Sequence, residues 1–312
     1  MGRSGTRVER RYGGAGQKPP AEQRPEEQNG ARLLRRGTVP IPTERTRQLS
    51  EERSARLRLA NRIAAINGQL AAIASDGVLR PIERAHLAYT RSRTLIEAVF
   101  ELPTAQCVGE TKRAVASLVD MIVADDETAR GLLRVCQHDH TTFTHSVNVG
   151  MYGTCLARRL YGTHSSHNLR ELGAGFFLHD LGKTGISQAI LNKPGKLSER
   201  ELVAIRSHPY RGFALLAEAN QASEECRLIA LQHHERDGGG GYPQGRSGSE
   251  IHHYARICSI ADVFDALVSQ RPYKDAVSPY RALEIMRDEM LGHFHRELLE
   301  SFVMMLSPRP GT

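Results

Sequence analysis

The sequence has few aromatic residues and no tryptophan: Phe, Tyr and Trp together make up 5% of its 312 residues. A chain of this length can bury a sizeable core, which must then be mostly aliphatic. Its five cysteines, Cys107, Cys136, Cys155, Cys226 and Cys258, are scattered and form no CxxC pair. We therefore expect reduced, buried thiols rather than a disulfide framework, as in a cytoplasmic protein.

Long apolar runs are also missing. No stretch approaches the ~20 apolar residues of a membrane span, and the Arg-containing amino terminus has no apolar segment after it. The sequence therefore predicts a cytoplasmic protein with no membrane partner. Alternating strand patterns and a glycine-rich phosphate loop of the nucleotide-binding kind are absent too, which argues against a response-regulator receiver domain.

The net charge of +7 comes almost entirely from one end of the chain. Residues 1–50 hold 11 of the 42 Lys and Arg but only 5 of the 35 Asp and Glu. Residues 1–42 also have few large apolar residues, so we predict a disordered basic tail. The near-neutral remainder argues against a nucleic-acid partner.

Helical periodicity begins after this tail. Apolar residues repeat at spacings of four and three on one face, at Leu59, Ile63, Ile66, Leu70 and Ile73. This seam fits either a coiled-coil dimer or a helix packed on its own domain. Further helices are predicted from Pro81 to Phe100, around residues 115–122 and over 127–137. We interpret residues 43–134 as a regulatory or dimerisation module.

The chemistry of the chain is concentrated around FLHDLGK, residues 177–183. Imidazoles and carboxylates are good ligands for divalent cations, and a carboxylate can bridge two of them. Five His and two Asp lie on or beside predicted helices within about 120 residues: His145, His179, Asp180, His208, His233, His234 and Asp262. Seven ligands are too many for one tetrahedral zinc but suit two metals, an arrangement used repeatedly to cleave phosphoesters.

In this order and spacing, the HD pair, HHE and GYP resemble the HD-GYP branch of the HD phosphohydrolases. The resemblance covers residues 135–306, with 307–312 left as a tail. It implies an all-α helical bundle that hydrolyses cyclic di-GMP, a bacterial second messenger, to linear pGpG, and it leaves open whether pGpG is cut again to GMP. It also implies one metal held by His145, His179, Asp180 and Asp262, and a second held by Asp180, His208, His233 and His234.

The resemblance assigns further roles. Asp180 and Lys183 would be catalytic, and the substrate would contact Lys183, Gly241, Tyr242, Arg271 and Lys274. Asp265, one helical turn after Asp262, would orient a ligand or a lysine. The ligand types favour two divalent ions of iron or manganese. Cyclic di-GMP, a second copy of the chain, and a diguanylate cyclase or other signalling protein are the expected partners.

Two positions depart from the family. Some relatives have a Glu four residues before the first His, which recruits a third metal; here Thr141 stands there. The glycine loop has Gly238 where the family has Asp, with Asp237 one residue early. We therefore expect two metals and a more flexible loop that Gly238→Asp would order, raising activity.

Three alternatives remain open. The chain is a weak or inactive cyclic di-GMP receptor, or it hydrolyses another cyclic dinucleotide or nucleotide, or its tail binds nucleic acid. Intact ligands argue against the inactive receptor, while the altered loop argues for it. The remaining paired histidines match no ligand position of the family and are interpreted as solvated or locally bonded.

Overall fold

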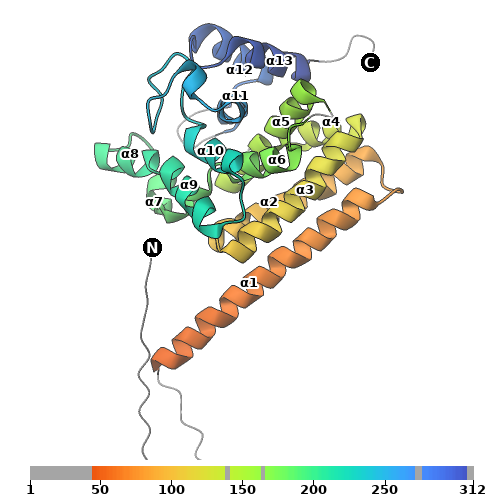
Figure 1. The fold of residues 1–312 in the computed structure, drawn as a ribbon, viewed down its shortest axis with the longest axis vertical. Coiled ribbons are helices and arrows are strands. Elements are labelled where there is room, and N and C mark those ends of the chain that lie inside the picture. Colours follow the sequence, from red (N-terminus) through yellow and green to blue (C-terminus); the bar gives the residue numbers. More distant parts are fainter. Residues whose placement is uncertain (1–43, 138–140, 163–165, 271–275, 308–312) are drawn as a thin grey trace, which may run out of the picture.

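The computed structural model describes residues 44–137, 141–162, 166–270 and 276–307. These residues form helices and turns with no β-strand among them, which confirms the predicted all-α class (Figure 1). The predicted tails are residues 1–42 and 307–312; apart from Ser307, they lie outside the described residues. In the part of the chain that the structure describes, no helix is long and apolar enough to cross a membrane.

Four helices form the amino-terminal part: α1 (Glu44–Ser75), α2 (Pro81–Glu101), α3 (Ala105–Ala124) and α4 (Asp126–Val135). In α1, the predicted seam faces inward: Ile63, Ile66 and Leu70 are buried against α2 and α3. The seam therefore packs within its own chain rather than against a second one. The amino-terminal end of α1 projects beyond the other helices, and residues 47–58 are exposed (Figure 1).

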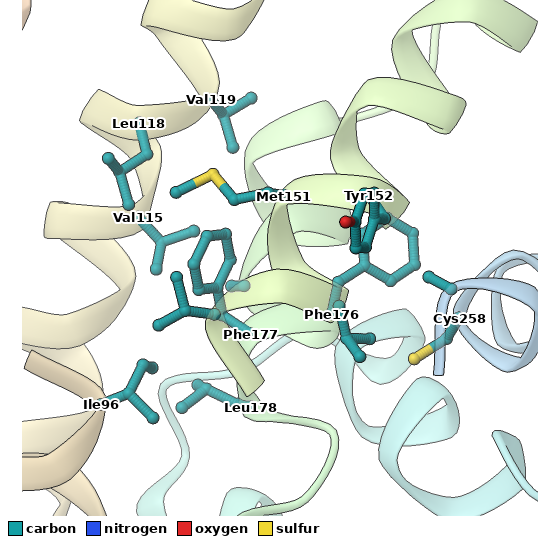
Figure 2. Close-up of a cluster of buried hydrophobic side chains, with 14 of the residues drawn as sticks. Ile96, Val115, Leu118, Val119, Met151, Tyr152, Phe176, Phe177, Leu178 and Cys258 are labelled. Carbon is teal, nitrogen blue, oxygen red and sulfur yellow. The ribbon is translucent and has the colours of Figure 1, made fainter. Parts of the chain in front are cut away.

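The centre of the molecule is the pair α5 (Thr142–Tyr161) and α6 (Leu169–Leu178). Figure 2 shows Phe177 of α6 on the side of Val115, and Phe176 on the side of Tyr152 and Cys258. Gly150 of α5 allows this close packing, because a Cβ there would lie 2.4 Å from the Phe177 ring. Helix α6 ends at Leu178, so the HD pair lies in the turn that follows.

The remaining elements surround this pair. They are η1 (Leu181–Gly185), α7 (Gln188–Leu191), α8 (Glu199–Arg206), α9 (His208–Ala219), α10 (Glu224–Gln232), η2 (Gly248–Glu250), α11 (His253–Val268), α12 (Pro279–Glu284), the π-helical turn η3 (Ile285–Glu289) and α13 (Arg296–Leu306). Helix α8 begins with a capping box: the Ser198 hydroxyl accepts the Glu201 amide, and the Glu201 carboxylate accepts the Ser198 amide. One continuous core extends from Ala60 in α1 to Phe302 in α13.

Candidate metal centre

The seven predicted ligands come from five separate places in the chain. His145 lies in the first turn of α5, and His179 and Asp180 follow α6. His208 begins α9, and His233 and His234 follow α10. Asp262 lies within α11. Six of the seven thus lie in a first helical turn or just beyond a helix end, where the backbone is free to turn a side chain inward.

The structure brings these side chains together as two adjoining sets. Within each set, the potential ligand atoms lie within 4.8 Å of one another. One set is His145, His179 and Asp262, and the other is Asp180, His208, His233 and His234. These are the two groups of potential metal ligands among the described residues. The other described histidines therefore form no further metal site.

Asp180 connects the two sets, because its two carboxylate oxygens face different ones. Oδ2 lies 3.4 Å from His179 Nε2 and 3.8 Å from His145 Nε2. Oδ1 lies 3.1 Å from His208 Nε2 and 3.8 Å from His233 Nε2. This geometry suits a carboxylate that bridges two cations.

Backbone carbonyls fix the tautomers of three imidazoles. Nδ1 of His179 lies 2.8 Å from Phe176 O, and Nδ1 of His208 lies 2.7 Å from Ile205 O. Nδ1 of His233 is 2.9 Å from the carbonyl oxygen three residues before it. A carbonyl only accepts hydrogen bonds, so each Nδ1 carries the proton and each Nε2 presents a lone pair to the site.

Electrostatics keep the second set in its metal-binding form. Burial by itself raises the pKa of Asp180, but the positive charge of the neighbouring Lys183 holds that pKa well below its usual value. Burial lowers the pKa of His234 to about 3 and that of His233 well below 6.5. Carboxylate and neutral imidazole are the forms that coordinate a metal.

The first set differs because His145 lies between two carboxylates. Its Nε2 is 3.0 Å from Asp262 Oδ1, and its Nδ1 is 2.7 Å from Asp265 Oδ2. Burial lowers the pKa of His145, but these two hydrogen bonds outweigh burial and raise the pKa to about 9. Asp265 therefore contacts a predicted ligand, His145. This position fits the role that the sequence suggested for Asp265, which was to orient a ligand or a lysine.

Two buried atoms of the site have no hydrogen-bond partner among the described residues: His179 Nε2 and Asp180 Oδ1. A buried polar atom without a partner is costly in a protein interior. Both atoms belong to predicted ligands and both face the site. The donor set and these two atoms therefore fit divalent cations.

Sequence reasoning missed the support behind Asp265. Asn148 lies one helical turn after His145, and its Nδ2 donates to Asp265 Oδ1 at 2.6 Å. The Tyr89 hydroxyl of α2 donates to Asn148 Oδ1 at 2.8 Å. The amino-terminal helices thus reach the metal centre through hydrogen bonds. The spacing of Asn148 from His145 was a usable signal, but nothing in the sequence pairs Asn148 with Tyr89.

Two of the predicted substrate-binding residues, Lys183 and Tyr242, lie beside predicted metal ligands. Lys183 donates to Asp180 Oδ2, and its side chain is 19% exposed. The Tyr242 ring stacks on His234, with ring centroids 4.6 Å apart, and the Arg206 guanidinium lies over the Tyr242 ring, 5.4 Å from its centroid. Arg271 and Lys274 lie outside the described residues.

The glycine loop is held in place, contrary to the flexibility we expected. The Glu235 carboxylate is buried and accepts the amides of Gln244 at 2.7 Å and Arg246 at 3.0 Å. At Gly241 a Cβ would lie 2.5 Å from Glu235 Cα, so only glycine fits there. The Gly238 amide donates to Gly292 O at 2.6 Å, and a Cβ on Gly238 would lie 3.0 Å from that oxygen.

Thr141, at the position of the third-metal Glu, has a structural role in this chain. It is the N-cap of α5, and its hydroxyl accepts the Thr144 amide at 3.1 Å. This cap starts the helix one turn before His145.

A family model described as HD domain matches residues 134–298. The chain belongs to the HD domain family. Its HHE and GYP motifs place it in the HD-GYP branch, as the resemblance predicted. The solved structure of Bd1817, a HDG"Y"P protein from Bdellovibrio bacteriovorus, shares the fold: the TM-score is 0.64 at 20% identity, over 82% of this chain and 80% of that one.

Two curated relatives are informative about chemistry. Cyclic di-GMP phosphodiesterase PA4108 of Pseudomonas aeruginosa is 34% identical over 233 residues, which are 73% of this chain and 55% of the relative. The 3'3'-cGAMP-specific phosphodiesterase 3 of Vibrio cholerae is 39% identical over 149 residues, which are 48% of this chain and 32% of the relative. The chain thus spans about half or less of the length of these relatives.

Proposed function

We propose that this protein is a metal-dependent phosphodiesterase that hydrolyses cyclic di-GMP to linear pGpG, with further cleavage to GMP. The observation that carries this proposal is Asp180, whose two oxygens face two adjoining sets of ligands. The name of the Pseudomonas relative supports the choice of substrate.

Two divalent cations per chain, iron or manganese, are the proposed cofactors. His145, His179, Asp180 and Asp262 would hold one, and Asp180, His208, His233 and His234 the other. The abundance of imidazole and the absence of thiolate from the sets favour these metals over softer ones. When bound, such a pair supplies Lewis-acid chemistry for the phosphoryl group and activates water for attack.

The protein's own residues then bind and orient the phosphodiester. Lys183 lies beside Asp180, so its positive charge is next to the place where a phosphoryl group would meet the two sets. We assign Arg271 and Lys274 to the other phosphoryl oxygens, Arg as a two-pronged donor and Lys as a point charge. We assign Tyr242, whose ring stacks on His234, and Gly241 to contact with a base of the substrate.

A second candidate substrate is the hybrid dinucleotide 3'3'-cGAMP, favoured by the similarity to the Vibrio enzyme. The inactive-receptor alternative loses support, because the loop with Gly238 is fixed by Glu235 and Gly292.

The remaining proposals concern the setting of the enzyme. We place it in the cytoplasm, consistent with five free, buried cysteines. We also propose a homodimer and a signalling partner such as a diguanylate cyclase. Because Ile63, Ile66 and Leu70 are buried within the chain, the dimer would use other surface, such as the exposed Leu49 and Leu57.

The test is an anaerobic assay of the purified protein with Mn(II) or Fe(II), in which cyclic di-GMP and 3'3'-cGAMP are each separated from their products. We expect pGpG from cyclic di-GMP, and a lower kcat/KM for 3'3'-cGAMP. The matched control is Asp180→Asn, which should be inactive. Faster hydrolysis of 3'3'-cGAMP would favour the second candidate, and no hydrolysis of either by the metal-loaded protein would refute the proposal.

A further inference from the structure

A pocket lies away from the metal centre, where α4, the carboxyl end of α5 and α13 meet. Its volume is about 370 Å³, in the range of small-molecule sites. Its walls include Ala129, Arg130, Leu133, Arg158, Arg159 and Met305. Arg158 is on the same helix as His145 but about 20 Å further along it, so the two sites are separate.

Positive charge dominates this pocket. Three guanidinium groups line it, against the single carboxylate of Asp126, which forms an ion pair with Arg158. Among the described residues, neither Arg130 nor Arg159 has a carboxylate within ion-pair distance, whereas Arg158 does. In addition, Arg158 Nε is buried and has no hydrogen-bond partner in the described part of the chain. The pocket thus has two uncompensated charges and a buried donor without an acceptor.

A purely structural role explains only part of this arrangement. Arg158 and Arg159 lie in the last turn of α5, where cations interact favourably with the helix dipole. Arg130 belongs to a different helix, α4, and gains nothing from that dipole. Nor does the dipole supply an acceptor for the buried Arg158 Nε. A buried donor is normally paired, so the helix dipole leaves this donor unexplained.

We propose that this pocket binds a nucleoside monophosphate. Guanidinium groups match phosphate oxygens with two parallel hydrogen bonds, and the excess of two positive charges matches a phosphomonoester better than a carboxylate. The aliphatic side chains of Ala129, Leu133 and Met305 provide an apolar wall for the base. Because the walls come from both α4 and the α5–α13 pair, the ligand would hold these helices together.

The experiment titrates the full chain with GMP, and with guanosine as a ligand that lacks the phosphate, by calorimetry and thermal unfolding. We expect GMP at about 100 times its Kd to raise the Tm by about 5 °C, and guanosine to have no effect. Arg130→Gln and Arg159→Gln should each weaken GMP binding by about tenfold or more, the scale of one charged hydrogen-bonding group. Arg134→Gln, on the same helix as Arg130 but outside the pocket, should bind as wild type does.

The Asp180→Asn variant separates this pocket from the metal centre. Since the pocket does not involve the proposed metals, Asp180→Asn should keep its GMP affinity. The proposal would be overturned if binding were lost in Asp180→Asn, if guanosine bound as well as GMP, or if Arg130→Gln and Arg159→Gln both bound GMP normally.

Discussion

At the scale of single residues, the metal centre depends on a repeated local device. In His179, His208 and His233, Nδ1 donates to the carbonyl three residues earlier. Each of these residues is at or next to a helix end, where carbonyls and amides lack full helical pairing. The direction in which Nε2 points is therefore decided locally, by where a helix begins or ends.

His145 is oriented differently, by the long-range contact with Asp265. We predict that Asp265→Asn lowers metal affinity at the set of His145, His179 and Asp262 by about 10–100-fold. An amide can donate to Nδ1 and so favour the tautomer whose protonated Nε2 faces the metal. A competition titration with a chelator would measure the change.

The control for this prediction is Ser269→Ala. The Ser269 hydroxyl also donates to Asp265, at 3.3 Å, but does not touch His145. Its removal should leave the metal affinity within about threefold of wild type, a loss of at most about 0.6 kcal/mol. Equal affinities for Asp265→Asn and wild type would show that Asp265 does not orient His145.

Sequence reasoning at this scale depended on motifs. The seven predicted ligands lie together in the structure, and the motifs place six of them at or near a helix end; their binding of metal stays a prediction. Asn148 and Tyr89 could not be paired from sequence, because their hydrogen bond depends on how α2 packs against α5. No local pattern encodes that packing.

At the scale of elements, the contact of α5 with α6 positions the HD pair beside His145. We predict that Gly150→Ala destabilises the protein by about 1–3 kcal/mol, because the new Cβ would overlap the buried Phe177 ring. Gly68→Ala in α1 is the matched control: a Cβ there meets nothing within 4 Å, and the higher helix propensity should add up to about 1 kcal/mol. Denaturant unfolding of both variants would test this, and a Gly150→Ala variant as stable as wild type would contradict it.

The glycine loop shows why sequence alone misjudged another element. Four consecutive glycines predicted freedom, but Glu235 and the backbone of Gly292 fix the loop from outside it. We now predict that Gly238→Asp lowers the Tm and gives a kcat/KM no higher than wild type, because its Cβ would press on Gly292 O. Gly77→Asp, with open space around the new Cβ, controls for the added charge. A higher kcat/KM in Gly238→Asp would restore the original expectation.

At the scale of the whole molecule, periodicity predicted the helices well but not their partners. The seam at Ile63, Ile66 and Leu70 fitted both a dimer and an internal contact, because an apolar stripe does not say what covers it. The structure covers it with α2 and α3, within a core that continues to Phe302. The boundary at residues 134 and 135 between a regulatory module and a catalytic domain stays a prediction.

The most direct test of the two-metal account is elemental analysis of the protein after anaerobic loading with Mn(II) or Fe(II) and removal of free metal. We predict about two metals per chain in the wild type, about one in Asp262→Ala, which alters one set, and one or none in Asp180→Ala, which removes the shared ligand. A wild type that holds a single metal, or an Asp180→Ala variant that retains two, would contradict the account.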